Sequence, residues 1–209
     1  MNKSSSVVFV IDDDASLRQS VVRWLQSVGY EGEAFESAAD FLARPPHPGP
    51  SCVIVDVQMP GMDGVALQDS LIKRRRDEQL IFLTGYGNVP TCARVMKAGA
   101  ADFLQKPFTS DELSKAVERA LVRSTEQQLR TVRRNEARLL LDSLTPREFE
   151  VMQLVLRGML NKQIAGELGT AEQTVKIHRG RMMRKVGVTS VAELTRLVQR
   201  AGVAPPDET

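Results

Sequence analysis

The sequence predicts an α/β domain with a doubly wound, five-stranded parallel sheet, joined by a helical linker to an all-α four-helix domain. Short continuous apolar runs, of the kind that buried parallel strands show, occupy residues 7–11, 53–55, 80–83 and 103–104. Amphipathic helical stripes alternate with these runs, and a parallel sheet needs such helices on both faces. The second half instead contains helices separated by a short glycine turn, which is typical of a helix-turn-helix.

The helices of the first half follow from the spacing of their apolar residues. Apolar residues that share one helical face occur in residues 65–71 and 113–121. They also occur earlier in the chain, at Leu17, Val21, Trp24, Leu25 and Val28. We therefore expect residues 1–122 to form the first domain.

The segment after this domain is polar. Among residues 123–138 only Leu129, Val132 and Ala137 are apolar, and the segment contains neither Gly nor Pro. These features predict a solvent-exposed helix, which we interpret as a linker over residues 123–141.

The linker is followed by a clear helix start. Thr145 stands at the N-cap, Pro146 at the first helical position and Glu148 three residues after the cap, which together predict a capping box. Further helices are expected over residues 161–168, 171–186 and 190–201. Residues 142–209 are therefore predicted to form a compact helix-turn-helix domain.

Composition limits the class of protein. Of 209 residues, 42% are hydrophobic and 26% charged, as in ordinary soluble proteins, and no apolar run is long enough for a membrane span or signal peptide. We expect a cytoplasmic protein without a membrane partner. Cys52 and Cys92 lack the spacing of metal ligands and are interpreted as reduced packing residues.

Charge is unevenly distributed along the chain. Residues 1–125 contain 14 of the 28 Lys and Arg residues and 16 of the 26 Asp and Glu residues, which leaves 14 basic against 10 acidic residues in the second half. Five basic residues fall within residues 176–185, on one predicted helix. This local excess favours a nucleic-acid partner, although a solvated helix face would look the same.

Polar residues follow the predicted strands where each strand ends. The acidic run 12–14, Asp56, Thr84 and Lys106 each come after an apolar run. Because the carboxyl ends of parallel strands meet at one edge of a sheet, these side chains are expected to converge there. Carboxylates can hold Mg²⁺, with Asp13 and Asp56 as direct ligands and Asp12 acting through water, while Lys106 and Thr84 contact phosphoryl oxygens. The sequence therefore predicts a phosphate-handling pocket.

Residues 56–64 are the most specific segment, because an Asp at a strand end is followed by a Pro-Gly turn. With the other pocket residues, this segment resembles the receiver domain of bacterial response regulators, which has a flavodoxin-like fold. The resemblance implies that Asp56 accepts a phosphoryl group from a sensor histidine kinase, and that Mg²⁺ is held by Asp13, Asp56 and the backbone carbonyl of Gln58, with Asp12 acting through water.

The same resemblance implies a conformational switch. Thr84 would move toward the phosphoryl group while Phe103 turns inward, and the bond between Lys106 and Pro107 would be cis. Phe103 fits equally well as an ordinary core aromatic residue. Tyr86 and Asn88 are candidates for modulating the lifetime of the phosphoryl group.

Three segments of the second half, residues 144–148, 161–165 and 174–179, resemble the LuxR-type helix-turn-helix of the NarL/FixJ subfamily. The resemblance implies promoter DNA and RNA polymerase as partners, and a homodimer formed on phosphorylation through residues 89–98 and the fifth strand. The residues expected at the DNA are Lys162, Thr174, Val175, Lys176, Ile177, His178, Arg179 and Arg181.

Two of these assignments have alternatives. Val175 has helical spacing with Met182, Met183 and Val186, which also fits a packing residue. Gly180 stands where some relatives carry a long base-reading side chain, so this chain either lacks that reader or allows DNA to approach the backbone closely.

Other functions fit less well. A Mg²⁺-dependent phosphohydrolase of the haloacid-dehalogenase type needs a second Asp two residues after the nucleophile, where this chain has Gln58. RNA binding is disfavoured because Phe149 is the only aromatic residue after position 125. A constitutive DNA-binding regulator that works without phosphorylation is the nearer alternative.

Overall fold

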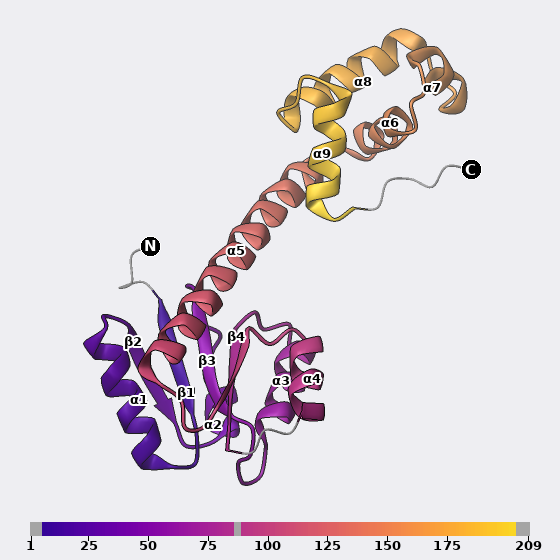
Figure 1. The fold of residues 1–209 in the computed structure, drawn as a ribbon. Coiled ribbons are helices and arrows are strands. Elements are labelled where there is room, and N and C mark those ends of the chain that lie inside the picture. Colours follow the sequence, from indigo (N-terminus) through magenta and orange to yellow (C-terminus); the bar gives the residue numbers. More distant parts are fainter. Residues whose placement is uncertain (1–5, 86–88, 204–209) are drawn as a thin grey trace. The chain divides into compact units, whose positions relative to one another are not determined.

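The structure, a computed structural model, describes residues 6–85 and 89–203 and divides into two compact units, residues 1–128 and 129–209. The described part of the first unit contains a five-stranded parallel sheet with strand order β2-β1-β3-β4-β5 (Figure 1). This order is one of the two common doubly wound arrangements, with its switch point between β1 and β3. The strands are β1 (Val7–Ile11), β2 (Glu31–Phe35), β3 (Ser51–Asp56), β4 (Gln79–Thr84) and β5 (Asp102–Gln105).

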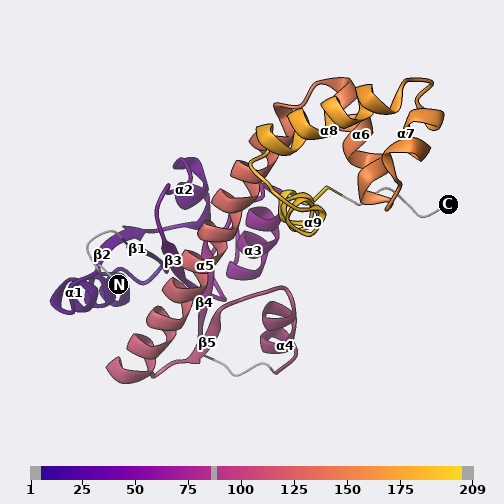
Figure 2. The ribbon, with the colours of Figure 1, turned by 90° about the horizontal axis from the view of Figure 1, so that it is seen from above.

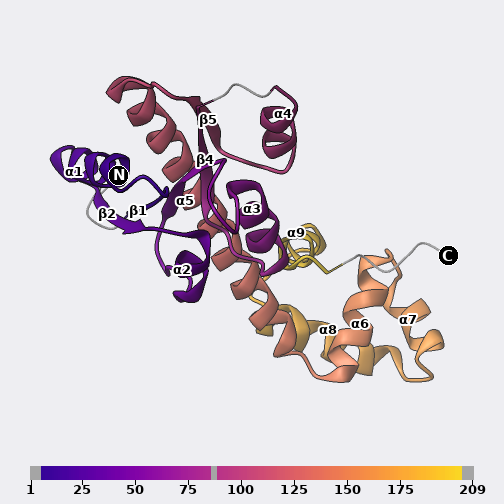
Figure 3. The ribbon, with the colours of Figure 1, turned by 90° about the horizontal axis from the view of Figure 1, so that it is seen from below.

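The sheet separates two hydrophobic cores. Alternate residues of the central strands point to opposite faces, so Phe9 and Val53 enter one core while Val10 and Ile54 enter the other. Helices α1 (Ala15–Ser27) and α5 (Ser110–Asp142) cover one face, and α2 (Ala38–Ala43), α3 (Gly64–Lys73) and α4 (Val89–Lys97) cover the other (Figures 2 and 3). The predicted doubly wound sheet is confirmed.

Two elements of this unit have no clear signal in the sequence. Strand β2 reads Glu-Gly-Glu-Ala-Phe and is mostly exposed, because it lies at the edge of the sheet. Helix α2 has only six residues, with Ser37 as its N-cap. An exposed edge strand and a helix of less than two turns leave little periodic pattern to read.

The loop before β4 lies at the end of the sheet opposite Thr84 and is organised by buried ion pairs. Arg76 pairs with Glu78, and the guanidinium of Arg44 lies 3.9 Å from the ring centroid of Phe9. The ring of His47 is half-buried with its edge toward Phe9. These residues pack one end of the sheet.

Helix α5 continues through the predicted linker as one element of 33 residues. Its first turns pack on the sheet, and Ser124 still accepts a hydrogen bond from the backbone N–H of Ser51 at 3.0 Å. Near its other end, Ala137 and Leu141 are buried in the core of the second unit. The stretch of α5 that belongs to neither core is therefore shorter than residues 123–141.

The second unit is helical. The capping box of Thr145 and Glu148 is present at the start of α6, as the sequence predicts. Gly169, with φ 58°, lies in the turn between α7 and α8, a conformation that favours glycine. The helices after α5 are α6 (Pro146–Leu156), α7 (Asn161–Glu167), α8 (Glu172–Lys185) and α9 (Val191–Ala201). Within the described residues, no helix combines the length and hydropathy that a membrane span requires.

Candidate functional site

The three consecutive aspartates after β1 have three different environments. Asp12 is 1% exposed, and its Oδ1 accepts a hydrogen bond from the backbone N–H of Asp14 at 2.9 Å. Asp13 is exposed. Asp14 is the N-cap of α1, where its Oδ1 accepts from the N–H groups of Ser16 and Leu17 at 2.8 and 3.2 Å. The run therefore supplies one buried carboxylate, one exposed carboxylate and one helix cap.

Lys106 joins the ends of β1 and β3. Its Nζ donates to Oδ2 of Asp12 at 2.8 Å and to Oδ2 of Asp56 at 3.1 Å. Burial alone lowers the pKa of Lys106, but the hydrogen bonds and charges of the two aspartates outweigh it and raise the pKa above its ordinary value. Lys106 is therefore a cation at neutral pH, held against the predicted phosphoacceptor.

Asp12, Asp13 and Asp56 form a cluster suited to a hard divalent cation. One carboxylate oxygen from each residue lies within 4.8 Å of the others. Oxygen donors that leave room for water are the ligands that Mg²⁺ takes at phosphate sites, so these residues fit the predicted ion. The N–H of Gln58 faces Oδ1 of Asp56 at 3.4 Å, which places the loop after β3 beside the same cluster.

The remaining pocket residues lie along the carboxyl edge of the sheet. Thr84 ends β4, is 5% exposed, and accepts a hydrogen bond at its backbone oxygen from the N–H of Lys106. The Lys106–Pro107 peptide bond is cis, as the resemblance implies. Phe103 on β5 is partly buried against the core on the α3 and α4 side, a position compatible with both of its predicted roles. Tyr86 and Asn88 lie outside the described residues.

Two residues near the pocket, Arg18 and Gly64, were not predicted from the sequence. A guanidinium nitrogen of Arg18 donates to the backbone oxygen of Asp12 at 2.6 Å and so ties α1 to the acidic run. Gly64 begins α3 at a point where an added Cβ would lie 2.4 Å from the backbone oxygen of Asp56. The only signal for Gly64 is its place eight residues after Asp56, and Arg18 has no local signal because its partner lies across a helix start.

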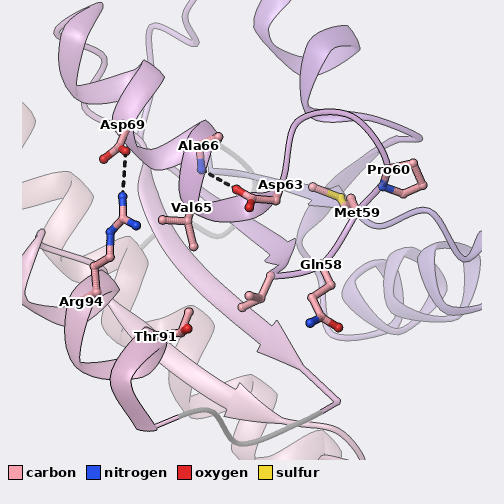
Figure 4. A pocket seen from close by; sticks show the side chains of 10 residues that line it. Gln58, Met59, Pro60, Asp63, Val65, Ala66, Asp69, Thr91 and Arg94 are labelled. Atoms are coloured by element: carbon pink, nitrogen blue, oxygen red, sulfur yellow. Dashed lines mark hydrogen bonds and ion pairs between the residues drawn. The ribbon is translucent and has the colours of Figure 1, made fainter.

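A groove of about 750 Å³ runs beside the loop after β3, between that loop, α3 and α4 (Figure 4). Gln58 and Met59 form one wall. On the other side Arg94 of α4 pairs with Asp69 of α3 at 3.1 Å, and both side chains are exposed. Among the described residues of α4, Val95 is the buried one, so this helix is held less firmly than α3.

Helix α8 displays most of the residues predicted to meet DNA. Lys176, Ile177 and Arg181 are exposed, with Ile177 45% exposed although it is apolar. Thr174, His178 and Arg179 are half-buried, and Lys162 is exposed on α7. The surface is thus formed by two successive helices, as helix-turn-helix geometry requires.

Two of the residues predicted to contact DNA, Arg179 and Val175, contribute to the folding of the second unit. Arg179 donates to the side-chain oxygen of Asn161 at 3.0 Å, which fixes α8 against the first residue of α7. Val175 is 0% exposed in the core of the second unit, so its prediction as a DNA contact is wrong and its interpretation as a packing residue holds. An apolar side chain at this helical position points inward, away from the surface that Lys176 and Ile177 share.

Known proteins give independent information about this arrangement. The family model for the response regulator receiver domain matches residues 8–118, and the model for bacterial regulatory proteins of the luxR family matches residues 142–198. The chain is 42% identical over 203 residues to nodulation protein W of Bradyrhizobium diazoefficiens, covering 96% of this chain and 88% of that protein. It is 38% identical over 200 residues to response regulator protein TodT of Pseudomonas putida, with the same two shares covered.

Solved structures agree with these matches over nearly the whole length. The response regulator StyR superposes with a TM-score of 0.81 at 42% identity, covering 94% of this chain and all of that one. Full-length FixJ from B. japonicum gives a TM-score of 0.56 at 34% identity, covering 96% and 99% of the two chains. The chain therefore belongs to the response regulators of the NarL/FixJ subfamily, transcriptional regulators that carry a receiver domain and a LuxR-type helix-turn-helix domain.

Proposed function

We propose that phosphorylation of Asp56 by a sensor histidine kinase switches this regulator into a dimer that binds promoter DNA. The observation that carries the proposal is the bridge of Lys106 between Asp12 and Asp56, next to the exposed carboxylate of Asp13. A partly buried cation between carboxylates at the end of a parallel sheet is an arrangement suited to phosphoryl transfer.

The chemistry follows from the positions of these side chains. An oxygen of Asp56 attacks the phosphorus of a phosphohistidine, the P–N bond breaks, and its electron pair stays on the imidazole nitrogen, which then takes a proton. Mg²⁺, held by Asp13, Asp56 and the carbonyl of Gln58 with Asp12 acting through water, would supply positive charge that offsets repulsion between the carboxylate and the phosphoryl oxygens. Lys106, already beside Asp56, neutralises another phosphoryl oxygen, and the hydroxyl of Thr84 bonds a third.

The phosphorylated pocket would then act on the rest of the receiver. Movement of Thr84 toward the phosphoryl group leaves space that Phe103 fills by turning inward, and both residues lie on strands next to α4. A change in α4 and β5 creates the dimer face, and the dimer presents two copies of α8 to a two-fold DNA site. In the cytoplasm such a dimer would recruit RNA polymerase at the promoter.

DNA binding would use base contacts and phosphate contacts made by exposed and half-buried residues of the second unit. Lys176 and Ile177 lie on the exposed face of α8 and are assigned to base edges in the major groove. Lys162, Thr174, His178, Arg179 and Arg181 are assigned to phosphates, which supply affinity and a dependence on salt.

A regulator that binds DNA constitutively is the second candidate, because the second unit has its own complete core. One experiment separates the two. The protein is incubated with Mg²⁺ and acetyl phosphate, and phosphoryl uptake, dimerisation and DNA affinity are compared for wild type and Asp56→Asn. We expect uptake, dimerisation and tighter binding only for wild type. Equal DNA binding by both proteins without uptake would establish the constitutive regulator.

A further inference from the structure

Helix α5 carries a row of exposed apolar side chains that neither core covers. Val122, Leu129, Val132 and Leu139 are 43%, 50%, 52% and 70% exposed. Surface helices normally place such residues toward a core, so a row of them in solvent indicates an interaction surface. We refer to these four residues as the α5 stripe.

The spacing of the α5 stripe identifies the kind of partner. Its members are separated by seven, three and seven residues, which is the a and d pattern of a heptad repeat. At 100° per residue they fall within one sector of about 100°. Most buried residues of α5 lie on the opposite side, since Ala116, Ala120 and Ser124 face the first unit and Ala137 and Leu141 the second unit, while buried Leu121 lies at the edge of this sector. The stripe thus matches another helix with the same repeat.

We infer that the α5 stripe pairs with the α5 stripe of a second copy of this chain as a short parallel coiled coil. This inference rests on the proposed function, because phosphorylation provides the dimer in which two α5 helices meet. The repeat occurs in this chain itself, so a two-fold symmetric pair satisfies both copies at once. Four partly exposed side chains are far fewer than the 20 to 30 residues per partner, roughly, of a stable interface. The stripe therefore reinforces a receiver dimer and does not create one.

Two polar residues in the same register explain why the pairing is weak. Thr125 takes a d position, and Glu136, which is exposed, takes an a position between Val132 and Leu139. In a parallel in-register pair the two Glu136 side chains would face each other, and like charges at such a position oppose association. Glu136 thus weakens the pairing of two α5 stripes in the unphosphorylated chain.

This arrangement makes a gain of function the sharpest test. Glu136→Leu completes the seam, and we expect the unphosphorylated variant to dimerise at least about tenfold more tightly than wild type, or about 1.4 kcal/mol. Arg134→Leu is the matched control, because it exchanges an exposed charged residue for Leu two positions away, on another face of α5. Sedimentation equilibrium measures both variants without phosphodonor. Equal association of the two variants would overturn the inference.

A second experiment uses disulfide cross-linking to test whether two α5 stripes meet in the phosphorylated protein. With copper phenanthroline as the oxidant, Val132→Cys is expected to form an intermolecular disulfide after treatment with acetyl phosphate, whereas Arg134→Cys and the parent chain, with its own Cys52 and Cys92, are not. Phosphoryl uptake and dimerisation are recorded on the same samples. Uptake and dimerisation without selective cross-linking at residue 132 would reject the coiled coil while leaving the proposed function intact. Absence of uptake together with tight association of Glu136→Leu would reject the proposed function and leave the pairing surface.

Discussion

The backbone oxygen of Asp56 lies 2.4 Å from the position that a Cβ on Gly64 would occupy. The backbone N–H of Gly64 also donates a hydrogen bond to the backbone oxygen of Val57 at 3.1 Å, so the start of α3 lies tightly against the end of β3. Neither backbone can give way easily. We expect Gly64→Ala to destabilise the first unit by about 1 to 3 kcal/mol and to slow phosphorylation of Asp56.

The single tryptophan makes this prediction measurable in the intact chain. Trp24 packs against the core on the α1 and α5 side, so its fluorescence during urea unfolding reports the first unit. Gly85→Ala is the control, because no atom lies within 4 Å of a Cβ added at residue 85. If both variants unfold at the urea concentration of wild type, the close approach at Gly64 has no energetic weight.

The sequence predicts the side chains of the pocket better than the residues that pack around them. Asp12, Asp56, Thr84 and Lys106 follow apolar runs, and the rule that parallel strands end at one edge is enough to bring them together. Gly64 depends on a backbone approach between α3 and β3, and local sequence carries no signal for such a distance.

The positive charge of Lys106 opposes the binding of Mg²⁺ near Asp12 and Asp56. Replacing it with Met leaves the carboxylates without their shared partner, so we expect Lys106→Met to bind Mg²⁺ roughly three- to tenfold more tightly. Phosphoryl transfer should nevertheless become slower, because the cation that neutralises a phosphoryl oxygen is lost. Calorimetric titration with Mg²⁺ and phosphorylation by acetyl phosphate measure the two effects separately.

The pH dependence of stability tests the ion pairs of Lys106 with Asp12 and Asp56. Since folding raises the pKa of Lys106, its contribution to stability is complete below its ordinary value of 10.5 and disappears as the pH rises through the folded pKa. Wild type should therefore lose this stability only in strongly alkaline solution. A wild-type protein that lost the Lys106 contribution near neutral pH would contradict the bridge.

Glu148 should make the second unit sensitive to acid. Hydrogen bonds from Lys185, and then from the backbone N–H of Thr145, lower the pKa of Glu148 from 4.5 to about 2. The stabilisation is thus complete above the ordinary pKa and is lost as the pH falls from about 4.5 toward 2. We expect Glu148→Gln to cost on the order of 1 to 3 kcal/mol at neutral pH and to remove this acid sensitivity.

Far-UV circular dichroism follows the loss of helix in both units, while fluorescence of Trp24 follows the first unit only. The difference between the two unfolding signals reports the unfolding of the second unit. Identical acid unfolding of wild type and Glu148→Gln in that difference would show that the pairing of Glu148 with Lys185 carries no stability.

The DNA surface shows where sequence pattern stops being informative. The helix limits and the capping box of Thr145 can be read from local signals, because caps and periodicity are properties of neighbouring residues. The division of α8 into exposed Lys176, buried Val175 and half-buried Arg179 depends on how α6 and α7 pack against it. Adjacent residues thus have unrelated roles.

Arg179 and Lys176 should respond differently to removal. Lys176 is exposed, so Lys176→Ala is expected to weaken DNA binding and leave stability within about 0.5 kcal/mol. Arg179 also bonds Asn161, so Arg179→Ala should weaken binding and destabilise the second unit by about 0.5 to 1.5 kcal/mol. Unfolding by circular dichroism and DNA titrations at several salt concentrations measure both effects. Equal stability of the two variants would mean that the bond to Asn161 contributes nothing.

Gly180 tests whether α8 is built for stability or for a close approach to DNA. A Cβ at this position would meet no atom within 4 Å, and the backbone is helical, so Gly180→Ala introduces no strain. Since Gly costs a helix about 0.8 to 1.0 kcal/mol relative to Ala, we expect the variant to raise the stability of the second unit by nearly that amount.

The DNA affinity of the same variant then decides between the two interpretations of this glycine. We expect affinity to stay within about threefold of wild type, because one methyl group adds little to an exposed helix face where Lys176 and Ile177 carry the long side chains. Gly166→Ala is the matched control, since it is also an exposed helical glycine with open space around it, on α7. A large loss of affinity at Gly180 alone, with the gain in stability intact, would mean that the backbone of α8 approaches DNA more closely than any side chain allows.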